Sequence, residues 1–280
     1  MQYFLNSRGD IVPDRVSHLA WLCDRDSGSK AIKRLEELYA QIFIDELQDY
    51  AGWDLEIISL LFKSSIPVTC VGDYKQATYR TNNSPKNKQY RDENIRKYFI
   101  QLQSQRLCDI LYANTTRRFN KEICDFINTI HADVEANVLP DPTIDESDLP
   151  ENSGVYIMGA SALSTYCEHY NPVILRYDKN VEIPFPCNCE IFNYGGSKGA
   201  TYERVVIIPV GTSLPFIQKQ KKITSNQTRA KFYVACTRAR HSVVFAVDNP
   251  QLNSSFQATE VKIADRVLPA YKYVSPQYNP

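Results

Sequence analysis

The stretch Ile42-Phe43-Ile44-Asp45-Glu46-Leu47-Gln48-Asp49 decides how the rest of the chain is interpreted. It opens as a short apolar run of strand length and ends in adjacent acidic residues. A second run, Pro67 to Val71, ends in the same way at Gly72-Asp73. Because parallel strands present their carboxyl ends at one edge, where α/β proteins bind ligands, we expect these acids to share a site.

Helix-like segments alternate with short apolar runs along the chain, which is typical of an α/β fold. The expected helices are 31–39, 53–62, 119–130 and 227–237. The expected later strands are 155–158, 173–175, 190–192, 205–208 and 243–247. Two polar stretches, 80–96 and 141–152, are expected to be surface loops or linkers. The pattern predicts two α/β lobes, residues 1–105 and 106–280.

Adjacent Asp45 and Glu46 at a strand end suit a Mg²⁺–nucleotide site. The first carboxylate can hold the metal, and the second can orient or deprotonate an attacking water. An isolated Asp-Glu pair is more often a solvated turn. This pair is not isolated, because Asp73 and Gln76 follow the next strand, and a neutral amide near a γ-phosphate can position water without adding repulsive charge.

Two later stretches also suit phosphate chemistry. Gly195 to Gly199 (GGSKG) is a flexible loop with a hydroxyl and a Lys, and Arg238 and Arg240 follow the predicted helix 227–237. Arginine can stabilise charge that develops on a transferring phosphoryl group. Taken alone, each stretch would be interpreted as a turn or a solvated helix end.

The order of five stretches resembles a known family. DELQD, VGDYKQATY, TRRFNKEI, GGSKGATYERVVIIP and YVACTRAR are similar to motifs II to VI of the superfamily 1 DNA helicases of the UvrD/Rep type. The resemblance implies two RecA-like lobes that bind ATP and Mg²⁺ and move along single-stranded DNA with 3′–5′ polarity. The expected activity is that of an ATP-dependent DNA helicase or translocase.

The resemblance also implies roles for individual residues. In the first lobe, Asp45 would hold Mg²⁺, Glu46 would be the catalytic base, Gln76 would sense the γ-phosphate, and Tyr79 would stack on a DNA base. In the second lobe, Arg238 and either Arg118 or Arg117 would bind the phosphates. Ser197 and Lys198 would touch the DNA backbone. Thr201 stands where many members have a Glu that contacts the ribose.

The phosphate-binding loop is the main departure from this family. No GxxxxGK[ST] occurs in the sequence, although that loop supplies the amides and the Lys that hold the phosphates. We therefore expect the first lobe to be incomplete at its N-terminus. The chain would be a helicase fragment or split subunit, with an N-terminal helicase half as partner. The alternative is a non-catalytic module that binds DNA or protein; a nuclease based on the paired carboxylates is weaker.

Composition limits these interpretations. Lys+Arg and Asp+Glu are equal at 32 each, so any DNA contact must come from local patches. The eight cysteines lack the spacing of a zinc site. No apolar run approaches the ~20 residues of a membrane span, and we expect a cytoplasmic protein.

Overall fold

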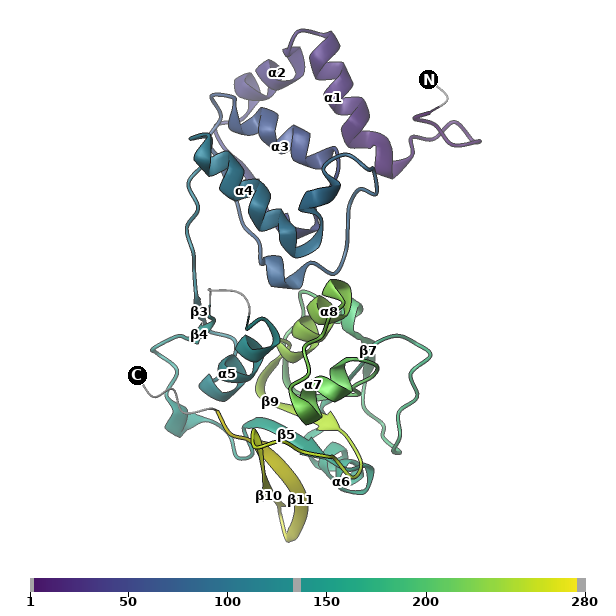
Figure 1. The fold of residues 1–280 in the computed structure, drawn as a ribbon, viewed down its shortest axis with the longest axis vertical. Helices are drawn as coiled ribbons and strands as arrows, with labels where there is room; N and C mark the ends of the chain where they lie inside the picture. The colour runs from purple at the N-terminus through teal and green to yellow at the C-terminus, as the bar shows by residue number, and fades with distance from the viewer. Residues whose placement is uncertain (1–2, 133–136, 276–280) are drawn as a thin grey trace. The chain divides into compact units, whose positions relative to one another are not determined.

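The computed structural model describes residues 3–132 and 137–275 of the chain. It divides into two compact units, Met1–Leu111 and Tyr112–Pro280, each built from helices and parallel strands (Figure 1). This mixed architecture confirms the α/β fold class. Among the described residues, no helix is both long enough and apolar enough to cross a membrane.

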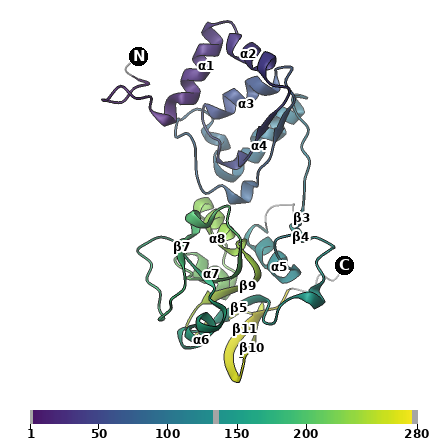
Figure 2. The same ribbon diagram turned by 180° about the vertical axis from the view of Figure 1, so that it is seen from behind.

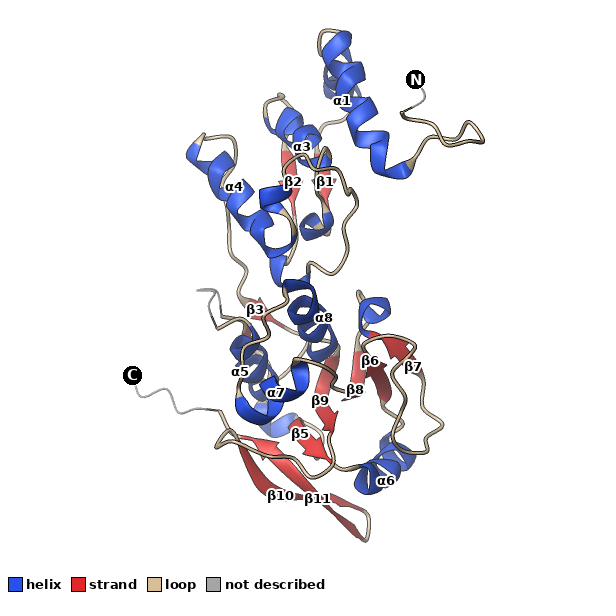
Figure 3. Cartoon of the chain, turned by 45° about the vertical axis from the view of Figure 1, so that its right-hand side comes forward, coloured by secondary structure: helices blue, strands red, loops and turns tan. Residues whose placement is uncertain are grey.

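Unit 1, Met1–Leu111, combines helices with a two-stranded parallel sheet (Figure 3). Its α-helices and strands are α1 (Val16–Asp26), α2 (Lys30–Leu38), β1 (Ile42–Ile44), α3 (Asp54–Phe62), β2 (Val68–Cys70) and α4 (Ile95–Ser104). Short 3₁₀ helices are η1 (Pro13–Arg15), η2 (Leu47–Asp49), η3 (Tyr74–Gln76), η4 (Lys88–Tyr90) and η5 (Asp92–Asn94). The strands pair in parallel with Ile42 opposite Val68 and Ile44 opposite Cys70.

One face of this sheet is packed and the other is bare. Ile44 lies against a core that includes Leu55 of α3 and Tyr98 of α4. Side chains alternate along a strand, so Phe43 and Val71 project from the opposite face, where they are 72% and 60% exposed. Parallel strands are usually covered on both faces. Within the described residues, this sheet therefore leaves apolar surface uncovered.

Unit 2, Tyr112–Pro280, is built on a seven-stranded sheet in the order β10-β11-β5-β9-β8-β6-β7. Its strands are β3 (Thr115–Thr116), β4 (Leu139–Pro140), β5 (Gly154–Met158), β6 (Val173–Arg176), β7 (Ile191–Asn193), β8 (Tyr202–Ile207), β9 (Ala239–Ala246), β10 (Phe256–Ile263) and β11 (Arg266–Tyr273). Its helices are α5 (Lys121–Ile130), η6 (Glu146–Asp148), α6 (Ala160–Tyr170), η7 (Tyr194–Ser197), α7 (Ser213–Lys219) and α8 (Asn226–Cys236).

The sheet of unit 2 has a hydrophobic core on each face. Val155, Val205 and Val243 lie in the core formed with α5, α7 and α8. Their neighbours Tyr156 and Val206 lie in the second core, formed with α6 and the β10–β11 hairpin. Burial on both faces explains why these strands are continuous apolar runs in the sequence.

Four α-helices (α1, α4, α6 and α7) and the terminal hairpin were absent from the expected elements. α1 and α4 lack the strong apolar periodicity of α5. Helix α5 also has a capping residue before it, Asn120, whose side chain accepts the Ile123 N–H at 3.0 Å. The hairpin β10–β11 pairs antiparallel and adds to the otherwise parallel sheet at β5. It projects from the rest of unit 2 in both views (Figures 1 and 2).

Candidate functional site

The carboxyl ends of β1 and β2 lie side by side, as the sequence predicts. The Val71 N–H donates to the Ile44 carbonyl at 2.8 Å, and the Leu47 N–H donates to the Val71 carbonyl at 3.0 Å. These bonds extend the pairing beyond the strands themselves. They bring the Asp45-Glu46 pair and the segment Asp73 to Gln76 to the same edge.

Gln48 links the two strand ends through its side chain. Its amide donates to the Glu46 carboxylate, and its carbonyl oxygen accepts the Asp73 N–H at 3.0 Å. Asp73 in turn accepts the Lys75 N–H at 3.0 Å and the Gln76 side-chain amide at 2.9 Å. The result is a continuous network from Glu46 through Gln48 and Asp73 to Gln76.

The backbone at Glu46 adopts an unusual conformation. Glu46 has φ 50° and ψ 42°, the left-handed region that non-glycine residues seldom occupy. Such conformations cost about 1–3 kcal/mol and concentrate at functional sites. The Glu46 N–H donates to Asp45 Oδ1 at 2.7 Å, and both side chains stay exposed. The turn therefore presents two carboxylates to solvent at the sheet edge.

Lys75 lies within the same segment but is buried, at 4% exposed. Burial lowers the pKa of its ammonium group, and the nearby Asp73 carboxylate partly opposes that shift. Burial also raises the pKa of Tyr50, with further contributions from Asp54, Cys70, Asp45 and Asp49. The strand-end acids thus influence the titration of neighbouring groups.

The described residues contain no group of three or more His, Cys, Asp or Glu side chains placed to hold a metal. Mg²⁺ is commonly held by one or two carboxylates together with waters and substrate phosphates. Asp45 and Glu46 fit that kind of site, since both are exposed and adjacent. They do not form a metal cage.

Tyr79 follows η3 in unit 1 and is 65% exposed. Neighbouring Arg80 is held by two bonds to Asp92, at 2.8 and 2.7 Å. The Arg80–Asp92 pair anchors the chain just after Tyr79 and leaves that ring accessible to a planar ligand.

In unit 2, Arg238 is buried at 1% exposed. Its Nε donates to the Val234 carbonyl at 2.9 Å, and its two terminal nitrogens donate to the Ala200 carbonyl at 3.2 Å and to Thr237 Oγ1 at 2.9 Å. The guanidinium thus joins the end of α8 to the loop before β8. In this conformation the Arg238 side chain stabilises the packing of unit 2.

The two adjacent arginines, Arg117 and Arg118, have different surroundings. Arg118 donates to the Thr237 carbonyl at 3.4 Å, which places it beside Arg238. Arg117 is 84% exposed along its side chain and pairs with Asp141 at 2.8 Å. Hydrogen bonds from Thr143, followed by the Arg117 contact, hold the pKa of Asp141 well below its usual range. Arg118 is therefore the arginine that shares its surroundings with Arg238.

The loop between β7 and β8 carries the remaining predicted residues. The Ser197 hydroxyl is fully buried and donates to the Tyr194 carbonyl at 2.8 Å. Lys198 is half-buried, and Thr201 is exposed. Ser197 thus shapes the loop, while Lys198 and Thr201 lie nearer its surface.

The sequence alone indicated no role for two residues of these sites, Gln48 and Tyr202. Gln48 lies inside the acidic stretch, and the only sequence feature that could have indicated a role for it is a neutral amide between carboxylates. Tyr202 donates its N–H to the Arg238 carbonyl at 2.8 Å. No spacing pattern could have predicted that contact, because it joins residues that are distant in the sequence.

Comparison with known proteins identifies one segment. Residues 14–94 match the family model described as the UvrD/REP helicase N-terminal domain. This range includes β1, β2 and both strand-end acidic segments. Among curated proteins, none matches the chain.

Solved helicase structures show distant likeness. The PRRSV helicase is 19% identical with a TM-score of 0.42, over 82% of this chain and 41% of that one. The arterivirus nonstructural protein 10 helicase in complex with DNA is 17% identical with a TM-score of 0.43, over 75% and 40%. The C-terminal domain of a possible DNA helicase from Lactobacillus plantarum WCFS1 is 12% identical with a TM-score of 0.29, over 50% and 91%. The chain spans about two fifths of the length of the two viral helicases.

Proposed function

We propose that the chain, whose residues 14–94 match the UvrD/REP helicase N-terminal domain model, is part of an ATP-dependent DNA helicase or translocase. It would act in the cytoplasm on single-stranded DNA, with the 3′–5′ polarity that the motif resemblance implies. The observation that carries the proposal is the network from Glu46 through Gln48 and Asp73 to Gln76. It couples the predicted base to the predicted phosphate sensor across two strand ends.

In the proposed mechanism, Asp45 would hold the metal and Glu46 would orient or deprotonate water. Bound Mg²⁺ would supply positive charge to the phosphate oxygens. Gln48 restrains the Glu46 carboxylate, and Asp73 restrains the Gln76 amide, so each group is held in place before reaction. A shift of Gln76 upon phosphate loss would pass through Asp73 and Gln48 to Glu46.

Unit 2 would contribute cations and DNA contacts. Arg118 and Arg238 are the proposed phosphate ligands, and Arg238 must first leave its backbone acceptors. Arg117 is the weaker candidate, since it is engaged with Asp141. Thr201 stands at the sugar-contacting position; Lys198 would meet the DNA backbone, Ser197 would support it by shaping the loop, and Tyr79 of unit 1 would stack on a base.

The proposal includes a partner, an N-terminal helicase half that supplies the phosphate-binding loop. The uncovered apolar face at Phe43 and Val71 supports it. Exposed apolar surface of this kind commonly marks an interaction site. Asp45 lies on the same side of its strand as Phe43 by alternation, so a segment that covered Phe43 would end near the acidic pair.

A second candidate is a non-catalytic module that binds DNA or protein. The burial of Arg238 favours it, because a guanidinium with three fixed acceptors is not free to stabilise a transition state. The absence of GxxxxGK[ST] from the sequence favours it as well.

Steady-state ATP hydrolysis by the purified chain, with and without single-stranded DNA, tests the proposal. We expect DNA-stimulated turnover, either alone or after addition of a fragment carrying GxxxxGKT, that Glu46→Gln abolishes. Turnover equal to that of the Glu46→Gln variant under both conditions would establish the non-catalytic module instead.

A further inference from the structure

Strand β7 is the outermost strand of the unit 2 sheet, and its side chains are partly exposed. It pairs only with β6 among the described strands. Ile191 and Phe192 are 39% and 37% exposed, and Asn193 is exposed as well. A large, partly exposed aromatic side chain on an edge strand is a candidate contact for a ligand.

The Phe192 ring lies parallel to the Tyr202 ring. Their centroids are 6.1 Å apart and their planes differ by 13°. Tyr202 begins β8 and is itself held by its N–H bond to the Arg238 carbonyl and by partial packing on the unit 2 core. Tyr202 therefore backs Phe192 and restricts its rotation, which lowers the entropy that a ligand stacking on Phe192 must overcome.

In the sequence, the glycine-rich loop Gly195–Gly199 lies between Phe192 and Tyr202. Nothing lies within 4 Å of where a Cβ would stand at Gly195, Gly196 or Gly199. The loop backbone is therefore open to close approach, while the inward Ser197 hydroxyl holds its shape. An exposed backbone and a half-buried Lys198, which closely follow Phe192 in the sequence, offer contacts for the phosphate, while the Phe192 ring offers a contact for the base of a nucleotide.

Nearby charges are partly neutralised. Glu203 follows Tyr202, but the Arg240 guanidinium lies 3.7 Å from its carboxylate, and the His241 ring nitrogen lies 2.6 Å from it as a hydrogen-bonding partner. Arg240 remains 56% exposed. Burial, followed by the charge of the exposed Glu190, raises the pKa of the Tyr202 hydroxyl. The region is therefore not strongly repulsive toward a polyanion.

We propose that Phe192, backed by Tyr202, is a base-stacking residue for single-stranded nucleic acid, with the backbone phosphate held at the Gly195–Lys198 loop. The inference rests on the proposed single-strand binding and assigns a new residue to it. Stacking on an aromatic ring needs a base with a π-face but no particular sequence. Phe192 therefore adds affinity for bases, and the loop adds affinity for phosphates.

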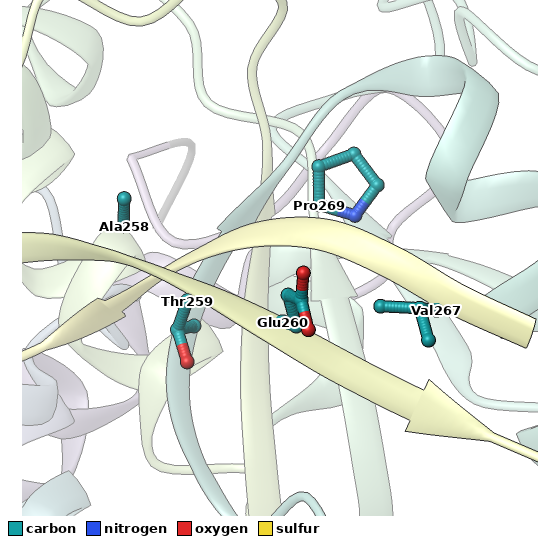
Figure 4. A pocket seen from close by; sticks show the side chains of 5 residues that line it. All are labelled: Ala258, Thr259, Glu260, Val267 and Pro269. Atoms are coloured by element: carbon teal, nitrogen blue, oxygen red, sulfur yellow. The ribbon is translucent and has the colours of Figure 1, made fainter.

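A second surface region, a shallow hollow, differs from this one. It lies on the β10–β11 hairpin and is lined by Ala258, Thr259, Glu260, Val267 and Pro269 (Figure 4). Glu260 is its only charged group, and no aromatic ring lines it. It offers neither a phosphate contact nor a stacking surface.

The test compares two fluorescent oligonucleotides of about 12 residues, a length within the usual single-strand site sizes. One is oligothymidylate, and the other is an abasic strand with the same phosphates. Fluorescence anisotropy with the full chain at one fixed salt concentration gives both affinities. We expect Phe192→Ala to weaken oligothymidylate binding by at least about five-fold and to leave abasic binding unchanged. The slope of affinity against salt should also stay the same, since no phosphate contact is lost.

Matched variants separate stacking from folding. Phe192→Tyr keeps a ring and should bind as the wild type does, whereas Phe192→Leu keeps apolar bulk and should behave like Phe192→Ala. Ile191→Ala removes similar area from the adjacent position and should change neither affinity. Equal loss with both oligonucleotides, no loss with either, or a wild type that binds both equally would overturn the stacking role alone. A wild type that binds neither would overturn the proposed single-strand binding as well.

Discussion

The side-chain carbonyl of Gln48 accepts the backbone N–H of Asp73 at 3.0 Å, which ties the end of β1 to the end of β2. Its amide donates to Glu46 from the other side. Gly72 leaves room for this contact, because a Cβ there would lie 2.6 Å from the Gln48 oxygen. The two acidic segments are therefore held together by one buried amide that is 4% exposed.

We expect Gln48→Leu to lower the free energy of unfolding by about 1–3 kcal/mol. The substitution removes the Gln48 acceptor of the part-buried Asp73 N–H and one donor to the exposed Glu46 carboxylate. The first loss is the costly one, since a donor that loses its partner away from water costs about that much. Urea denaturation followed by circular dichroism measures the change. Gln41→Leu is the matched control, since its exposed bond to Thr69 Oγ1 at 3.2 Å should contribute little. Equal stability of the wild type and Gln48→Leu would mean that the strand ends do not depend on this amide.

For Arg238→Ala we expect two separable losses. The carbonyls of Val234 and Ala200 and the Thr237 hydroxyl all lose a charged donor inside the core, so stability should fall by about 2–4 kcal/mol. In a reconstituted enzyme that remains folded, hydrolysis should also slow by about 10³ or more, as for arginine fingers. Arg240→Ala, at an exposed position two residues further on, should change stability by less than about 0.5 kcal/mol.

Thermal unfolding and ATP hydrolysis, both measured at a temperature where the variant stays folded, distinguish these roles. A folded Arg238→Ala chain that still hydrolyses ATP at the wild-type rate would leave Arg238 with a structural role only.

The sequence predicted the strand ends well because their pattern is local. An apolar run followed by acids places Asp45, Glu46 and Asp73 at one edge whenever the strands are parallel. It did not predict what their side chains would do: Gln48 is a bridge only because β1 and β2 pair in one register. The inward position of Arg238 depends on backbone carbonyls of α8 and of the loop before β8, which no motif encodes. α1, whose packing places His18 against Trp53, also depends on tertiary contacts.

We expect unit 1 to lose stability as pH falls through the range just below 6.5. The His18 ring stacks on Trp53 with centroids 3.9 Å apart, and burial, followed by the Arg25 charge, lowers the pKa of His18 from its ordinary value of 6.5. A lowered folded pKa means that the unfolded chain binds more protons in that window, so stability rises with pH across it. Denaturation at several pH values between about 5.5 and 7.5 measures the slope.

His18→Phe keeps an aromatic ring against Trp53 and removes the titrating group, so its stability should vary less with pH than that of the wild type. His169→Phe, at an exposed site on α6 of unit 2, is the control and should keep the wild-type slope. Identical slopes for the wild type and His18→Phe would remove His18 as the origin of the pH dependence.

Phe43→Thr tests the uncovered face of the unit 1 sheet. Phe43 is 72% exposed, so its replacement removes little buried surface and should change the free energy of unfolding by less than about 0.5 kcal/mol. Leu55→Ala, at a residue of the same unit that is 0% exposed, should cost about 2–5 kcal/mol. Because the exposed ring is removed, Phe43→Thr should also weaken binding of any fragment that restores hydrolysis. A stability loss as large as that of Leu55→Ala would mean that Phe43 is covered in solution by the chain itself, and the surface would then not be open to a partner.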